Sequence, residues 1–71
     1  MNYVVESFQL KNQEIDYTTR EEYLLSSKPA TVLTRFQEEF MAPTEPCKIN
    51  HHIGMLEIIL SDKIFFVEEA A

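Results

Sequence analysis

Residues 55–68 read Met-Leu-Glu-Ile-Ile-Leu-Ser-Asp-Lys-Ile-Phe-Phe-Val-Glu, and this stretch decides the fold. Two apolar runs flank a Ser-Asp step at positions 61 and 62, which is the pattern of a tight β-hairpin. A two-residue turn at that step predicts a register in which Leu60 faces Lys63 and Leu56 faces Val67. Alternate side chains of the two strands then point to opposite faces of the hairpin.

The predicted register gives the hairpin one strongly apolar face and one mixed face. The apolar face is expected to form the core, and it carries Leu56, Ile58, Leu60, Phe65 and Val67. The mixed face carries the alternate residues, which are Met55, Glu57, Ile59, Ile64, Phe66 and Glu68. A slip of one residue in the register would exchange the two faces.

The N-terminal third of the chain predicts two further strands. Alternating apolar residues indicate a strand over residues 2–10 and a second over residues 14–18. A three-residue turn at positions 11–13 joins them, with Asn12 suited to the left-handed conformation. Residues 18–25 fit either a capped helical turn or a continuation of the second strand. The extended form is favoured, because the serines at positions 26–27 are better placed to cap the next element.

The next element is an amphipathic helix that begins after Ser27. Ser27 suits the N-cap, Pro29 fits the first helical turn, and Pro43 ends the helix. Its apolar arc consists of Ala30, Val32, Leu33, Phe36, Phe40 and Met41. A brief strand is predicted over residues 47–51, and Gly54 marks a turn or bulge before the hairpin.

These elements predict an α+β fold in a single domain spanning residues 1–71. The expected architecture is an antiparallel sheet of four to five strands with the amphipathic helix packed on one face, in the order β-β-α-β-β-β. A core of this size rarely supplies more than about 3–5 kcal/mol, so small chains often depend on disulfides, metals or oligomerisation. The single cysteine, Cys47, excludes an internal disulfide, which leaves oligomerisation or partner binding as the expected route.

The charge balance restricts the classes of partner. Twelve Asp and Glu residues oppose six Lys and Arg, giving a net charge of −6. This argues against direct binding to nucleic acid or to an anionic membrane surface, and it fits a protein partner with a basic surface. The sequence has no apolar run near the roughly 20 residues of a membrane span and no signal-peptide pattern, so a cytoplasmic location is expected.

Catalysis and metal binding find little support in the residue pattern. Cys47, His51 and His52 form the one concentrated set of metal-ligating residues, with a spacing weaker than that of four-ligand zinc sites. The alternative is a cysteine that packs as a small hydrophobe beside two loop histidines. The lone glycine cannot build a phosphate or oxyanion cradle, so we expect no enzyme activity and no cofactor.

A partner-binding surface is predicted on the sheet face away from the helix. Aromatic and branched side chains on an uncovered sheet face indicate an interface. The predicted apolar members of this surface are Tyr3, Val5, Ile59, Ile64 and Phe66. Glu14 and Asp16 join this site as acidic members. They would stand about 6.7 Å apart on one strand face, close to the phosphate repeat of a nucleic-acid strand.

These features favour a small acidic binding protein without catalytic activity. It would dock on a protein partner and block a basic, nucleic-acid-binding surface. As a class, and without a shared motif, the chain resembles phage and mobile-element accessory proteins that inhibit host enzymes. Two alternatives stay open, namely a homo-oligomeric structural or accessory subunit, such as a homodimer, and a metal-binding protein that uses Cys47, His51 and His52.

Overall fold

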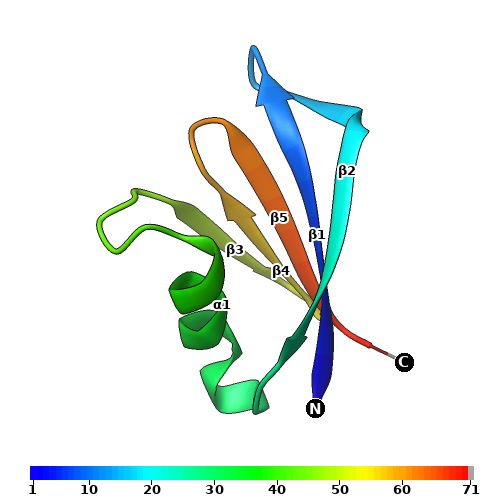
Figure 1. Cartoon of the computed structure of the whole chain (residues 1–71), viewed down its shortest axis with the longest axis vertical. Coiled ribbons are helices and arrows are strands. Elements are labelled where there is room, and N and C mark those ends of the chain that lie inside the picture. Colours follow the sequence, from blue (N-terminus) through cyan, green and yellow to red (C-terminus); the bar gives the residue numbers. More distant parts are fainter. Residues whose placement is uncertain (71) are drawn as a thin grey trace.

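One curved antiparallel sheet and one helical segment make up residues 1–70, the part of the chain that the structure, a computed structural model, describes (Figure 1). The elements are β1 (Asn2–Lys11), β2 (Glu14–Ser26), the 3-10 turn η1 (Pro29–Thr31), α1 (Val32–Phe40), β3 (Lys48–His52), β4 (Met55–Ile59) and β5 (Lys63–Glu69). The strand order across the sheet is β2-β1-β5-β4-β3. The predicted α+β class and element order are therefore confirmed.

The C-terminal hairpin has the predicted register. Leu56 lies opposite Val67, and Ile58 lies opposite Phe65. The Leu60 N–H donates to the Lys63 carbonyl at 2.8 Å, which closes the two-residue turn. Ile58, Leu60, Phe65 and Val67 are all buried, so the expected core face of this hairpin is also confirmed.

Strand β5 lies at the centre of the sheet because it pairs on both sides. One side pairs with β4 and the other with β1, so the N-terminal strand lies beside the C-terminal one. Backbone hydrogen bonds extend this pairing at both ends, from Leu10 N–H to the Asp62 carbonyl and from Ala70 N–H to the Asn2 carbonyl, each at 2.9 Å. The order of strands depends on this long-range pairing, which no local sequence pattern predicts.

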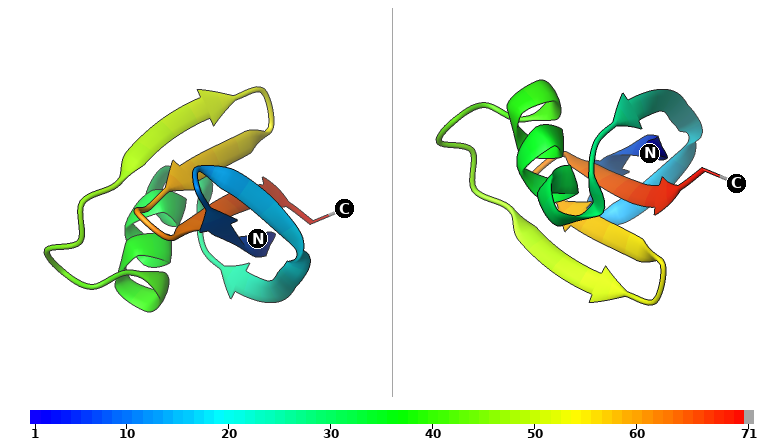
Figure 2. Two further views of the ribbon diagram at one scale, coloured as in Figure 1. Left: turned by 90° about the horizontal axis from the view of Figure 1, so that it is seen from above. Right: turned by 90° about the horizontal axis from the view of Figure 1, so that it is seen from below.

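The main core lies between α1 and the face of the sheet that curves around it (Figure 2). The Phe36 ring has no exposed surface, and its centroid lies 5.0 Å from that of Phe65 in an edge-on contact and 5.2 Å from that of Phe40 in a stacked one. Val32, Leu33, Phe40 and Met41 pack around this cluster. The apolar arc of the helix therefore covers the sheet as predicted, except that Ala30 lies in η1 and is exposed.

The predicted placement of Tyr3 and Val5 on the face away from the helix is wrong. Val5 lies opposite Val67, and residues directly opposite each other in an antiparallel sheet point to the same face. Both residues are therefore buried in the helix-side core. The alternate residues of β1, among them Phe8, occupy the other face.

The helix boundaries also differ from the prediction. Lys28 precedes η1 in an extended conformation, and Ser27 does not cap the helix. The Ser27 hydroxyl instead lies 3.0 Å from the Lys28 carbonyl, to which it donates. The regular helix ends at Phe40, ahead of Pro43, because Met41 turns to an extended conformation while its N–H still donates to the Gln37 carbonyl at 3.1 Å.

The structure also confirms the favoured interpretation of one segment and corrects two smaller boundaries. Residues 18–25 are strand throughout, so the extended interpretation of this segment is the right one. The strand predicted over residues 47–51 runs over Lys48–His52, and Cys47 lies just before it. The turn between β1 and β2 has two residues, Asn12 and Gln13, because Lys11 already pairs with Glu14.

Both residues of this turn adopt positive φ, 51° for Asn12 and 66° for Gln13. Two successive positive φ angles are the geometry of a type I′ hairpin turn, whose twist matches that of the flanking strands. Asn tolerates this conformation, whereas a residue with a longer side chain, such as Gln, is strained by roughly 1–2 kcal/mol. The chain therefore holds Gln13 in the left-handed region through the pairing of the strands on either side.

Replacing Gln13 by glycine is expected to stabilise the protein by about 0.5–1 kcal/mol. The substitution removes the left-handed strain, and the greater freedom of glycine in the unfolded chain offsets part of the gain. Urea unfolding monitored by circular dichroism measures the change. Gln9→Gly, at an exposed position within β1, is the matched control and should destabilise the protein. Equal losses of stability in both variants would contradict the proposed strain.

Candidate protein-binding face

The sheet surface opposite the helix is built from three cross-strand rows that the register fixes. The first row contains Leu24, Val4, Glu68, Met55 and His52. The second row contains Glu22, Glu6, Phe66, Glu57 and Asn50. The third row contains Phe8, Ile64, Ile59 and Lys48. We call these rows, together with the neighbouring Arg20 and Tyr17 of β2, the open face.

An aromatic cluster forms the apolar part of the open face. The Phe8 ring centroid lies 5.4 Å from that of Tyr17 and 6.0 Å from that of Phe66, both in edge-on contacts. Ile64 lies opposite Phe8 and is buried, with 4% of its surface exposed. Ile59 and Phe66 are half-buried, and Tyr17 is 70% exposed. The face therefore has a packed apolar layer from which aromatic and branched side chains still reach solvent.

The structure brings together only part of the predicted site. Ile59, Ile64 and Phe66 share the open face, although Ile64 is covered by its neighbours and is not itself accessible. Phe8 and Tyr17 belong to the same cluster but are not among the residues predicted for this site. Alternation along β1 places Phe8 and Val5 on opposite faces, but only the pairing with β5 decides that Phe8 lies on the open one.

Acidic side chains dominate the charged positions of the open face. Arg20 of β2 bridges two of them, with Nε 2.7 Å from Glu6 Oε2 and Nη2 2.5 Å from Glu22 Oε2. The four acidic residues of the face are Glu6, Glu22, Glu57 and Glu68, and its Lys and Arg residues are Lys48 and Arg20. The open face therefore carries an excess of negative charge around its apolar part.

Glu57 lies on the side of Phe66 away from Glu6, and two residues of β3 hold its side chain. Asn50 Nδ2 donates to Glu57 Oε1 at 2.9 Å, and His52 Nε2 lies 3.3 Å from the same oxygen. These contacts lower the pKa of the Glu57 carboxyl, with the Asn50 hydrogen bond as the largest cause and the His52 hydrogen bond as the second. Glu57 therefore presents a fixed carboxylate beside the aromatic cluster.

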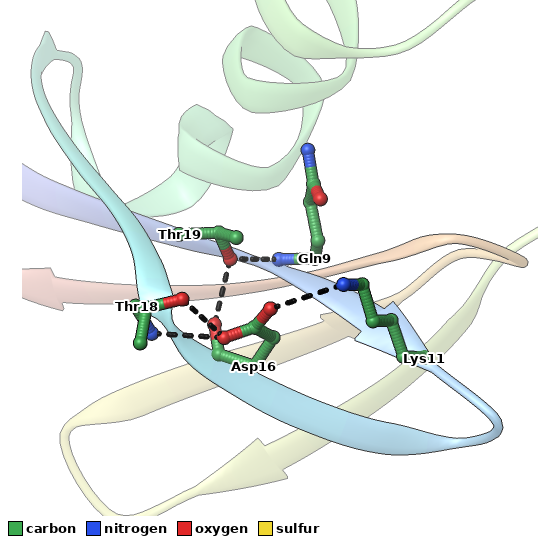
Figure 3. Close-up of polar contacts among 5 residues, drawn as sticks. All are labelled: Gln9, Lys11, Asp16, Thr18 and Thr19. Carbon is green, nitrogen blue, oxygen red and sulfur yellow. Dashed lines mark hydrogen bonds and ion pairs between the residues drawn. The ribbon is translucent and has the colours of Figure 1, made fainter.

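A large bulge in β2, whose polar contacts Figure 3 shows, places Tyr17 beside Phe8 on the open face. Ser7 pairs with Glu21, but Gln9 pairs with Asp16, so residues 17–20 of β2 lie opposite Phe8 alone. The Thr19 hydroxyl closes the gap, because it accepts the Gln9 N–H at 2.8 Å and donates to the Asp16 carbonyl at 2.6 Å. The extra residues let the Tyr17 ring reach Phe8.

Asp16 stabilises the bulge from its other side. Its Oδ1 accepts hydrogen bonds from the Thr18 N–H at 3.1 Å and from the Thr18 hydroxyl at 2.5 Å, and Oδ2 lies 3.7 Å from Lys11 Nζ. These contacts lower the pKa of the Asp16 carboxyl, with the Thr18 side chain as the largest cause. Glu14 is exposed beside the turn. The predicted pair of Glu14 and Asp16 thus includes one carboxylate that is engaged within its own strand.

The structure does not bring the predicted metal-ligating residues together. Cys47 packs against the helix-side core. His51 lies opposite Leu56 and His52 opposite Met55, so the two imidazoles point to opposite faces of the sheet. Among residues 1–70, no group of three or more His, Cys, Asp and Glu side chains is placed to hold a metal ion.

A surface hollow of about 460 Å³ lies away from the open face, between the second half of α1 and the loop that follows it. Its lining residues are Thr34, Gln37, Glu38, Met41, Ala42, Pro43 and Glu45. Glu45 Oε1 accepts the Ala42 N–H at 3.2 Å, which ties the loop to itself. The carboxylate of Glu45 therefore has a structural role in holding this loop.

Comparison of the chain with models of protein families, with curated proteins and with solved structures found no match. In the described residues, 1–70, neither helical element has the length and apolar character needed to span a membrane.

Proposed function

We propose that this chain is a non-catalytic binding protein that docks through its open face on a protein partner with a basic surface. The observation that carries the proposal is the exposure of Tyr17, together with the half-buried Ile59 and Phe66, on a face with an excess of glutamates. Aromatic anchors within a charged rim are typical of protein interfaces. Lys and Arg side chains of the partner would lie against Glu6, Glu22, Glu57 and Glu68.

Charge complementarity favours a different protein over a second copy as the occupant of this face. Glu6 and Glu57 flank Phe66 on either side. Two open faces packed against each other around Phe66 would bring these carboxylates close to the same residues of the second copy. Like charges brought together at an interface are destabilising, whereas Lys and Arg of a partner would complement them.

The proposed mechanism is steric and electrostatic blockade of the partner. Proteins that bind nucleic acid neutralise phosphates with Lys and Arg, so they expose the kind of surface that the open face complements. Occupation of such a surface would exclude the nucleic acid. Association driven by opposite charges is fast at low salt and slows as salt screens the charges.

Replacing Tyr17 by serine is expected to weaken partner binding by about tenfold or more, which is the range of an aromatic interface anchor. Ile53→Ser is the matched control, because Ile53 is fully exposed in the turn between β3 and β4 and lies outside the open face. Immobilised wild type and both variants would be used to capture proteins from the source cell. The affinity of a purified candidate would then be measured at low and high salt.

The expected result is a basic protein that wild type and Ile53→Ser retain and Tyr17→Ser loses. Its affinity for the wild type should fall as the salt concentration rises. Partner binding that is identical in wild type and Tyr17→Ser, or that is insensitive to salt, would contradict the proposal.

A further inference from the structure

The outer edge of β2 offers a regular row of backbone donors and acceptors. The sheet order leaves β2 without a neighbouring strand on this side (Figure 1). Ser27 N–H donates to the Met1 carbonyl at 3.0 Å, which fixes the phase of the β1–β2 ladder. Because an antiparallel ladder alternates, Tyr23 and Leu25 direct their backbone groups to β1, whereas residues 22, 24 and 26 direct theirs outward.

The last part of this edge, residues 23–26, has no bulge, proline or charge, although Glu21 and Glu22 lie directly before it. Edge strands are commonly protected by bulges, prolines or charges. The bulge of β2 affects residues 17–20, but residues 21–26 pair with β1 in an unbroken register. Leu24 lies in the middle of this segment and is 72% exposed. The segment is therefore both open to a further strand and apolar at its centre.

We propose that residues 22–26 of β2 pair in an antiparallel manner with the same residues of a second copy, around a two-fold axis at Leu24. In this register Leu24 faces Leu24, Tyr23 faces Leu25, and Glu22 faces Ser26, so within residues 22–26 no like charges stand opposite each other. The outward groups of Glu22, Leu24 and Ser26 then form three paired positions with roughly six backbone hydrogen bonds. A register centred on Glu22 would oppose two carboxylates and is disfavoured.

The dimer has a geometric consequence for the open face. Residues opposite each other in an antiparallel pair point to the same side, so the two sheets become one continuous sheet. Both open faces then lie on the same side of it, away from both helices. The dimer goes beyond the proposed function and does not depend on it, because it uses the strand edge and leaves the apolar cluster around Phe66 uncovered.

The substitution Leu24→Lys tests the proposed axis. It places two ammonium groups opposite each other, and the exposed position of Leu24 leaves the monomer fold intact. Sedimentation equilibrium over a range of concentrations should show a wild-type dimer and a dissociation constant raised by about tenfold or more in the variant. Ile53→Lys adds the same charge at a turn and should dimerise like the wild type. A wild type that is monomeric at every concentration, or a dimer unaffected by Leu24→Lys, would overturn the proposal.

A crosslink tests the same register without relying on repulsion. Hydrogen-bonded antiparallel pairs hold their Cα atoms about 5.5 Å apart, within the range that a disulfide spans. In a Cys47→Ser background, Leu24→Cys should form a disulfide-linked dimer under mild oxidation, and Ile53→Cys should do so far more slowly. Equal rates for the two cysteines would count against pairing at Leu24.

The two proposals fail separately. If the wild type dimerises, Leu24→Lys weakens the dimer and no basic partner is captured, then only the proposed function is wrong. If the wild type is a monomer and Tyr17→Ser abolishes binding to the basic partner, then only the proposed dimer is wrong.

Discussion

Replacing Phe36 by alanine is expected to destabilise the protein by about 3–5 kcal/mol, the range for a large aromatic deleted from a core. The ring is fully buried, and it contacts Phe65 of the central strand and Phe40 of its own helix. A core of this size rarely supplies more than about 3–5 kcal/mol in total. The variant should therefore be largely unfolded at room temperature, with its α1 detached from the sheet.

Circular dichroism and one-dimensional NMR would measure this loss. The matched control is Phe66→Ala, which removes the same ring from a half-buried position on the open face. This control should stay folded and lose less stability, because Phe66 is half-buried and packs beside Phe8 on the other face of the sheet. A Phe36→Ala variant with the melting temperature of the wild type would contradict the packing of α1 on the sheet.

Replacing Thr19 by valine is expected to destabilise the protein by about 1–3 kcal/mol. Valine keeps the shape of threonine but leaves the Gln9 N–H and the Asp16 carbonyl without the partners that the Thr19 hydroxyl provides. An intramolecular hydrogen bond contributes about 0.5–1.5 kcal/mol net, and this substitution removes two of them. The bulge should then loosen, and the Tyr17 ring should leave Phe8.

Urea unfolding measures the loss of stability, and hydrogen exchange at the Gln9 amide reports on the bulge directly. Thr34→Val is the matched control, because Thr34 is exposed on the outer side of α1 and the substitution there should change stability little. If the Gln9 amide of Thr19→Val exchanged as slowly as that of the wild type, the Thr19 hydroxyl would not be what holds the two strands together.

Local patterns in the sequence predict the C-terminal hairpin well. The Ser61-Asp62 step and the apolar runs beside it specify both the turn and the register, and the structure has both. The face of β1 that meets the helix is not specified locally, because Tyr3 and Val5 on one side and Val4 and Phe8 on the other are all apolar. Pairing with β5, which is distant in sequence, makes the choice.

The candidate site was predicted in part for the same reason. Ile59 and Phe66 follow from the hairpin register alone, whereas Phe8 and Tyr17 reach the open face through β1–β5 pairing and the bulge. One local feature of the sequence hints at the bulge. An Asp side chain often accepts a hydrogen bond from the backbone N–H two residues later, which forms an Asx turn. Asp16 and Thr18 have this spacing. The size of the bulge depends on the Gln9–Thr19 contact, which no spacing rule anticipates.

The central position of β5 has a consequence for how the chain acquires its structure during synthesis. Until β5 is made, the β1–β2 hairpin and the β3–β4 hairpin have no strand between them, and each has an unpaired inner edge. Contacts between residues far apart in sequence slow folding, and unpaired edges are prone to aggregation. The nascent chain is therefore most vulnerable when both hairpins have left the ribosome and residues 63–69 have not.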